Sequence, residues 1–159
     1  GLAVKHSPCC YALQLPIEAA RQLPRDTTGP FVVRTPAATV QPLIHARPRT
    51  GLEGKFSLQY AIATALLDDV PGFEAFSDAG VQRPEAQAII ERVSVALEPG
   101  GAGLLDGEVV VEAGGERAAL QHPLGSPARP ASTTDLETKR AMCGAPAETW
   151  ASAQRLLCT

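Results

Sequence analysis

Residues 92–97 are Arg92-Val93-Ser94-Val95-Ala96-Leu97, in which apolar and polar side chains alternate. Alternation of this kind predicts a half-buried strand. A second alternating segment follows around Val109 and Val111, and Gly114-Gly115 predicts a tight hairpin turn into a third strand over residues 117–121. Three consecutive strands with short links favour an antiparallel meander, so the expected fold class is α+β.

The N-terminal part of the chain predicts a helix over residues 8–23, because apolar side chains recur there at helical spacing. Pro16 either kinks this helix or starts a second one. Short strands are expected at residues 31–33 and 39–46. The second of these would lie at a sheet edge, because Pro42 cannot donate a hydrogen bond to a ladder.

The clearest helical pattern lies near the middle of the chain. Phe56, Tyr60, Ala63 and Leu67 are spaced so that they line one face of a helix. Short helices are expected over residues 73–90, where a proline stands at a favourable first-turn position. Helices are therefore expected both before and after the central strand.

The C-terminal part predicts a linker over residues 122–131, which contain three prolines. Thr134-Asp135-Leu136-Glu137 has the spacing of a capping box and predicts the start of a helix. A last helix is expected over residues 147–157. Together these elements predict one α+β domain over residues 1–159, with a small antiparallel sheet of about four strands and helices packed on one face.

Composition narrows the class of protein. The chain has 159 residues, of which 45% are apolar, and a net charge of −3. A chain of this size and apolar content can bury a hydrophobic core. Its negative net charge argues against a protein that binds nucleic acid. No apolar run is long enough to span a bilayer. The four cysteines form no secreted disulfide framework, so a cytoplasmic location is expected. The chain starts at Gly1, which suggests a piece of a longer protein.

Two short stretches are candidates for a binding site: Lys5-His6-Ser7-Pro8-Cys9-Cys10-Tyr11 and Gly54-Lys55-Phe56-Ser57-Leu58-Gln59-Tyr60. Each places a lysine at the start of a predicted helix, where backbone N–H groups and the helix dipole favour an anion. The pair suggests a pocket for a small carboxylate. The alternative is that both are ordinary solvated lysines.

The remaining chemistry-bearing residues have competing interpretations. Cys9 and Cys10 are small buried side chains, thiolates activated by a helix N-terminus, or metal ligands together with His6. The metal interpretation is the weakest, because a structural zinc site needs four ligands. His45 is expected to be structural and His122 solvated.

Several motifs, in order along nearly the whole chain, resemble the MmgE/PrpD family. They are Lys5-His6-Ser7-Pro8-Cys9-Cys10, residues 17–20, 54–63, 66–68, 92–95, 125–130 and 135–139, and the Gly114-Gly115 hairpin. The family includes 2-methylcitrate dehydratase, cis-aconitate decarboxylase and iminodisuccinate epimerase. The resemblance implies that this chain is the smaller C-terminal α+β domain, with the all-helical N-terminal domain absent.

The resemblance also implies a function, the C-terminal substrate-cleft domain of a polycarboxylate lyase, most similar to 2-methylcitrate dehydratase. An epimerase, a decarboxylase and a non-catalytic anion- or protein-binding module remain alternatives. Decarboxylase-like members have a histidine where this chain has Cys10. A thiol does not replace an imidazole in acid–base work at neutral pH unless its pKa is shifted.

Five residues match positions that the resemblance places at the substrate: Lys5, Cys10, Lys55, Ser57 and Tyr60. The catalytic acid and base are expected in the absent helical domain, so the isolated chain is expected to be inactive. The resemblance implies no metal and no cofactor. It implies a small polycarboxylate substrate, the helical domain and a second subunit of a homodimer as partners. The acidic net charge and the scattered basic residues predict neither nucleic acid nor a membrane as a partner.

Overall fold

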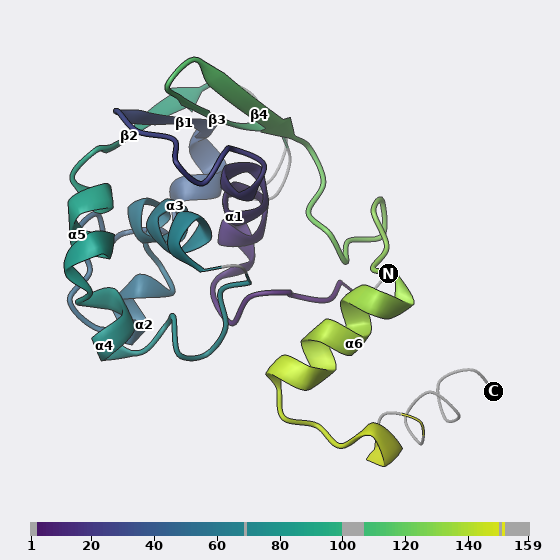
Figure 1. The fold of residues 1–159 in the computed structure, drawn as a ribbon. Helices are drawn as coiled ribbons and strands as arrows, with labels where there is room; N and C mark the ends of the chain where they lie inside the picture. The colour runs from purple at the N-terminus through teal and green to yellow at the C-terminus, as the bar shows by residue number, and fades with distance from the viewer. Residues whose placement is uncertain (1–2, 69, 100–106, 150, 152–159) are drawn as a thin grey trace.

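The computed structural model describes residues 3–68, 70–99, 107–149 and 151, and its fold is α+β (Figure 1). The strands are β1 (Phe31–Pro36), β2 (Val93–Glu98), β3 (Val109–Ala113) and β4 (Glu116–Leu120). The α-helices are α1 (Gln14–Arg21), α2 (Gly51–Gly54), α3 (Leu58–Leu67), α4 (Asp78–Val81), α5 (Pro84–Ile90) and α6 (Thr133–Met142). Two 3-10 helices are η1 (Tyr11–Leu13) and η2 (Ala37–Val40).

The four strands form one sheet in the order β2-β1-β3-β4. The hairpin of β3 and β4 is antiparallel, as the Gly114-Gly115 turn predicts. The expected meander is wrong in one respect, because β1 lies between β2 and β3 and runs parallel to β2. The helices α2 to α5 connect β1 to β2, and such a long connection lets neighbouring strands run parallel.

The helices cover one face of the sheet, as expected, and the core lies between the two layers (Figure 1). α1 contacts β3 and β4, and α3 contacts β2. Phe31, Val33 and Thr35 of β1 point into this layer and are buried, whereas Val32 and Arg34 on the other face are half-buried. The alternation along β1 therefore fixes which face of the central strand meets the helices.

The outer face of the sheet carries exposed ion pairs in place of a second layer of helices. Arg34 pairs with Glu98 and Glu112, each at 3.1 Å, across three strands. Arg117 lies 3.6 Å from Glu108 and 3.7 Å from Glu112. These side chains are about one third to one half exposed, so each pair contributes little to stability.

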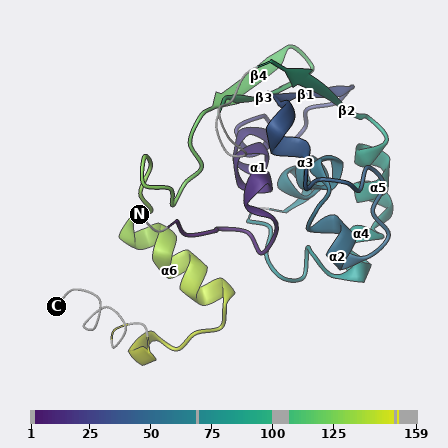
Figure 2. The ribbon, with the colours of Figure 1, turned by 180° about the vertical axis from the view of Figure 1, so that it is seen from behind.

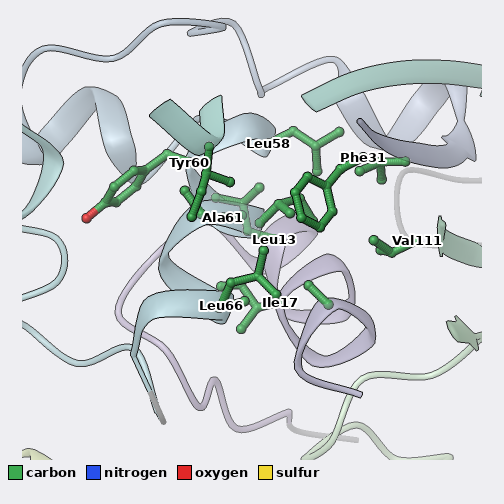
Figure 3. Close-up of a cluster of buried hydrophobic side chains, with 14 of the residues drawn as sticks. Leu13, Ile17, Phe31, Leu58, Tyr60, Ala61, Leu66 and Val111 are labelled. Atoms are coloured by element: carbon green, nitrogen blue, oxygen red, sulfur yellow. The ribbon is translucent and has the colours of Figure 1, made fainter. Parts of the chain in front are cut away.

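Helix α3 is buried on nearly all sides, which the periodicity did not predict. Of the predicted face, Tyr60 and Ala63 are buried, whereas Phe56 lies before the helix and Leu67 is 37% exposed. Residues on the other sides of the helix are buried too: Ala61, Ile62 and Thr64. Figure 3 shows α3 side chains packed among residues of α1, β1 and β3. A helix enclosed by neighbours has no single apolar stripe to detect.

The C-terminal end of α3 is tied to its surroundings by Asp68. Its carboxylate accepts hydrogen bonds from Arg83 at 2.9 and 2.7 Å and from the Thr64 hydroxyl at 2.6 Å. Arg83 also donates to the Gly80 carbonyl of α4 at 3.0 Å. Arg25 donates to the carbonyls of the last turn of α3. This network joins α3, α4 and the start of α5.

Two elements predicted from the sequence differ from the structure. The strand expected over residues 39–46 is wrong: η2 and irregular backbone occupy this region, because Val40 and Leu43 pack against the core at one-turn spacing. The helix expected over residues 8–23 begins at Tyr11, and Pro16 lies in the first turn of α1, where a missing N–H group is tolerated.

Helix α6 lies beside the N-terminal segment, apart from the two layers, in both views (Figures 1 and 2). None of its residues is fully buried. Its capping box is formed by Ser132 and Asp135, two positions before the predicted start at Thr134. Residues 147–149 and 151 are helical, and the rest of the predicted last helix lies outside the described residues. Within the described ranges, no helix has the length and hydropathy needed to cross a membrane.

Candidate functional site

Gln14, the first residue of α1, determines the path of the segment that precedes it. Its side-chain oxygen accepts hydrogen bonds from the N–H groups of His6 at 2.9 Å and Ser7 at 3.0 Å. Its amide nitrogen donates to the Ser7 carbonyl at 3.0 Å and to the Cys9 sulfur at 3.3 Å. Sequence reasoning missed this residue, although a polar side chain inside an apolar helix run is a signal for a buried hydrogen-bonding role.

Lys5 lies on this segment with its side chain exposed. Its ammonium group donates to the Cys9 carbonyl at 3.2 Å, one residue before the N-cap of η1. An ammonium group has three N–H donors. Two donors therefore remain for a ligand, and the bond to Cys9 keeps the charge close to the start of the helix.

The two lysine-bearing stretches meet in the fold. The backbone N–H of Cys10 donates to the carbonyl of Lys55 at 3.0 Å. Cys10 and Lys55 are both half-buried, and in the described part of the chain no ion pair or side-chain hydrogen bond involves Lys55. The contact brings the Lys5 segment and the turn after α2 side by side, so Lys5, Cys10 and Lys55 belong to one region.

Ser57 and Tyr60 lie next to this region but are buried. The Ser57 hydroxyl caps α3 by accepting the N–H of Tyr60 at 3.1 Å. The Tyr60 hydroxyl donates to the carbonyl of Ala75, and its ring packs edge-on against Phe76. Burial raises the pKa of Tyr60. Both side chains are 0% exposed, so in this conformation neither offers a surface to a ligand.

A third cation reaches the same segment from α6. The ammonium group of Lys139 donates to the carbonyl of His6 at 3.2 Å. Burial lowers the pKa of His6, although the carboxylates of Asp135 and Glu18 oppose this effect. Burial thus favours the neutral imidazole of His6, and its buried Nε2 atom has no hydrogen-bond partner among the described residues. Lys139 ends one of the stretches that resemble the family, but sequence reasoning did not place its side chain at the site.

The thiol of Cys9 is buried, and its environment does not favour a thiolate. Burial raises its pKa to about 12, and the neighbouring Cys10 adds to this shift. The attraction of Lys5 and Lys139 for a thiolate is too weak to reverse it. Of the three interpretations of Cys9, the structure favours the small buried side chain over the activated thiolate.

Iodoacetamide at neutral pH is expected to alkylate Cys143 and to leave Cys9 unmodified in the folded protein. Cys143 is exposed, whereas Cys9 is 3% exposed and remains protonated. Peptide mass spectrometry measures the two rates. Labelling after unfolding in urea is the control and should modify both residues. Equal rates in the folded protein would contradict the buried, protonated state of Cys9.

No group of three or more His, Cys, Asp or Glu side chains in the described ranges is arranged to hold a metal ion. The site consists instead of lysine ammonium groups on a hydrogen-bonded backbone. Such groups bind carboxylates by charge and hydrogen bonding.

One protein-family model matches most of this chain. The family model of the MmgE/PrpD C-terminal domain matches residues 7–157. The chain belongs to the MmgE/PrpD family. The match confirms the family resemblance drawn from the sequence, and it confirms that the chain is the C-terminal domain. The domain is that of a dehydratase and lyase family. No curated protein matches the chain.

The match to the MmgE/PrpD C-terminal domain covers Cys10, Lys55, Ser57, Tyr60 and the α6 helix, but it begins two positions after Lys5. The role of Lys5 therefore depends on the sequence motif and on the geometry of the segment. The match itself assigns none of these residues a contact with a substrate.

Proposed function

We propose that this chain is the substrate-cleft domain of a cytoplasmic polycarboxylate lyase that removes water from a substrate similar to 2-methylcitrate. The observation that supports this proposal is the hydrogen bond from Cys10 to the carbonyl of Lys55, which places the two lysine-bearing stretches together. Lys5, with two N–H donors free, binds a substrate carboxylate directly. Lys55 adds positive charge at the wall of the cleft.

Lys5 has a defined part in the reaction. Dehydration next to a carboxylate breaks a C–H bond and a C–O bond: a base takes the proton, the carbon–carbon double bond forms, and hydroxide leaves with a proton as water. Negative charge moves onto the carboxylate as the proton leaves. An ammonium group held at that carboxylate stabilises the charge in the transition state more than in the ground state, which is the requirement for catalysis.

The residues of this chain around Lys5 are poorly suited to proton transfer. His6 has its Nε2 atom buried, and Cys9 is a protonated thiol. We propose that the acid and the base come from a helical N-terminal domain that closes the cleft, and that the enzyme works as a homodimer without a cofactor. The chain alone would then bind polycarboxylates without turning them over.

An ultraviolet assay for double-bond formation or loss, with 2-methylcitrate, citrate and cis-aconitate, tests the function. The chain is compared with the full reading frame that contains it. Activity in the longer protein alone is the expected result. Double-bond chemistry in neither protein would refute dehydration and decarboxylation and would favour epimerisation or binding. Cys10 stands where decarboxylase-like members have a histidine, so loss of carbon dioxide is expected to be absent.

A further inference from the structure

We infer that the turn of residues 125–129, here called the Gly125 turn, positions the ammonium group of Lys5. The inference rests on the proposed function, since it assigns the turn a part in the same site. The turn belongs to the linker between β4 and α6, far from Lys5 in sequence. Its role follows from three sets of contacts.

The first set joins the turn to the residue before Lys5. The N–H of Val4 donates to the carbonyl of Gly125 at 2.9 Å. Gly125 has a φ of +83°, and a Cβ atom at this position would lie 2.3 Å from the Val4 carbonyl oxygen. No side chain fits there without moving one of the two backbones, because both atoms in conflict are held by the main chain.

The second set holds the turn itself in place. The N–H of Gly125 donates to the Arg129 carbonyl at 2.9 Å, and the N–H of Arg129 donates to the Ser126 carbonyl at 3.1 Å. The Arg129 guanidinium pairs with Glu18 of α1, whose carboxylate also accepts the N–H of Leu124 at 2.7 Å. The Glu18 side chain is only 12% exposed. The turn is thus held by α1, and its position does not depend on the N-terminal segment.

The third set of contacts holds the residues on either side of Lys5. Residues 3–5 are exposed and have no buried side chain to anchor them. Val4 is bound by Gly125, and the next residue after Lys5, His6, is bound through its N–H by Gln14 and through its carbonyl by Lys139. The backbone of Lys5 is therefore held from both sides. Displacing Val4 moves Lys5 away from the Cys9 carbonyl.

Gly125→Ala tests this inference in the chain of residues 1–159, with Gly115→Ala as the matched control. Gly115 has a similar φ of +87°, but nothing lies within 4 Å of the position that its Cβ would take, so the control carries the backbone strain without the clash. Acetic anhydride acylates neutral amines, and peptide mass spectrometry gives the rate at each lysine. In Gly125→Ala, acylation of Lys5 is expected to rise about fivefold, as for one lost hydrogen bond.

Lys55 in the same sample separates local displacement from general loosening. The expected result is a faster reaction of Lys5 alone, with Lys55 unchanged and with no change at either lysine in Gly115→Ala. An unchanged Lys5 rate, or an equal rise at Lys5 and Lys55, would overturn the inference.

The enzyme assay distinguishes this inference from the proposed function. In the full reading frame, Gly125→Ala should lower kcat/KM when Lys5 is present and have no further effect in the Lys5→Ala background. A further loss in that background would refute positioning through Lys5. If Lys5→Ala alone had no effect, the role of Lys5 in the proposed function would fail, while the acylation rates would still decide whether the turn positions Lys5.

Discussion

Lys5→Ala is expected to lower kcat/KM for the polycarboxylate substrate by about 10- to 100-fold, the effect of losing one hydrogen bond to a charged group. The variant removes the ammonium group that lies 3.2 Å from the Cys9 carbonyl at the start of η1. The N–H of Cys10 and the other backbone contacts of the segment remain. The measurement is steady-state kinetics of the full reading frame with the substrate identified by the ultraviolet assay.

The division of this loss between kcat and KM carries mechanistic information. A fall in kcat means that Lys5 acts on charge that develops in the transition state, whereas a rise in KM alone means that it only binds the ground state. Arg117→Ala is the control, because it removes the same charge from the outer face of the sheet. Kinetics of Lys5→Ala equal to those of Arg117→Ala would remove Lys5 from the site.

Asp68→Ala is expected to lower the free energy of unfolding by about 2 kcal/mol, as for a partly buried carboxylate that loses its hydrogen bonds to a charged partner. The carboxylate binds Arg83 through two hydrogen bonds and Thr64 through one, and its side chain is 25% exposed. Without it, the guanidinium of Arg83, itself 32% exposed, loses its partner between α3 and α4. Urea denaturation followed by circular dichroism measures the change.

Arg34→Ala provides the matched control for Asp68→Ala. It also breaks the ion pairs of an arginine, but these lie on the solvent-exposed face of the sheet. A loss of less than about 1 kcal/mol is expected there. If both variants lost the same stability, burial would not be what makes the Asp68 network strong.

The Asp68 network also predicts a dependence of stability on pH. Burial raises the pKa of Asp68, but the hydrogen bonds from Arg83 and Thr64 outweigh burial and hold the pKa below its usual value. An aspartate with a lowered folded-state pKa contributes stability above its unfolded pKa of about 4, and this contribution is lost as the pH falls below that value. Asp68→Asn should therefore flatten the loss of urea resistance in acid relative to the unmodified chain.

Patterns among residues that are close in sequence were enough to predict the hairpin and the strand β2. The Gly114-Gly115 turn fixed the hairpin, and the alternation of residues 92–97 identified β2. The place of β1 could not be predicted in this way. Whether β1 or β3 lies beside β2 depends on how the intervening helices pack, and no pattern within a single strand records that.

The candidate site was predicted in outline only. The two lysine motifs indicated an anion site, and the hydrogen bond between Cys10 and Lys55 brings their segments together. Spacing placed Tyr60 on the apolar face of its helix, and the family resemblance added a position at the substrate; in the structure its hydroxyl is used inside the core. Gln14 was missed although its partners, His6, Ser7 and Cys9, lie close to it in sequence. Gly125 could not be found in this way, because its partner Val4 is brought to it by tertiary structure.

The contacts of the N-terminal segment also have a consequence for biosynthesis. Lys5 is synthesised well before Gly125 and Lys139, which bind the residues on either side of it. Domains usually gain structure from the N-terminus during translation. The contacts on either side of Lys5 join residues of high sequence separation, and the entropy of closing such loops opposes them. We expect a nascent chain that ends before residue 125 to lack the contact that holds the residue before Lys5.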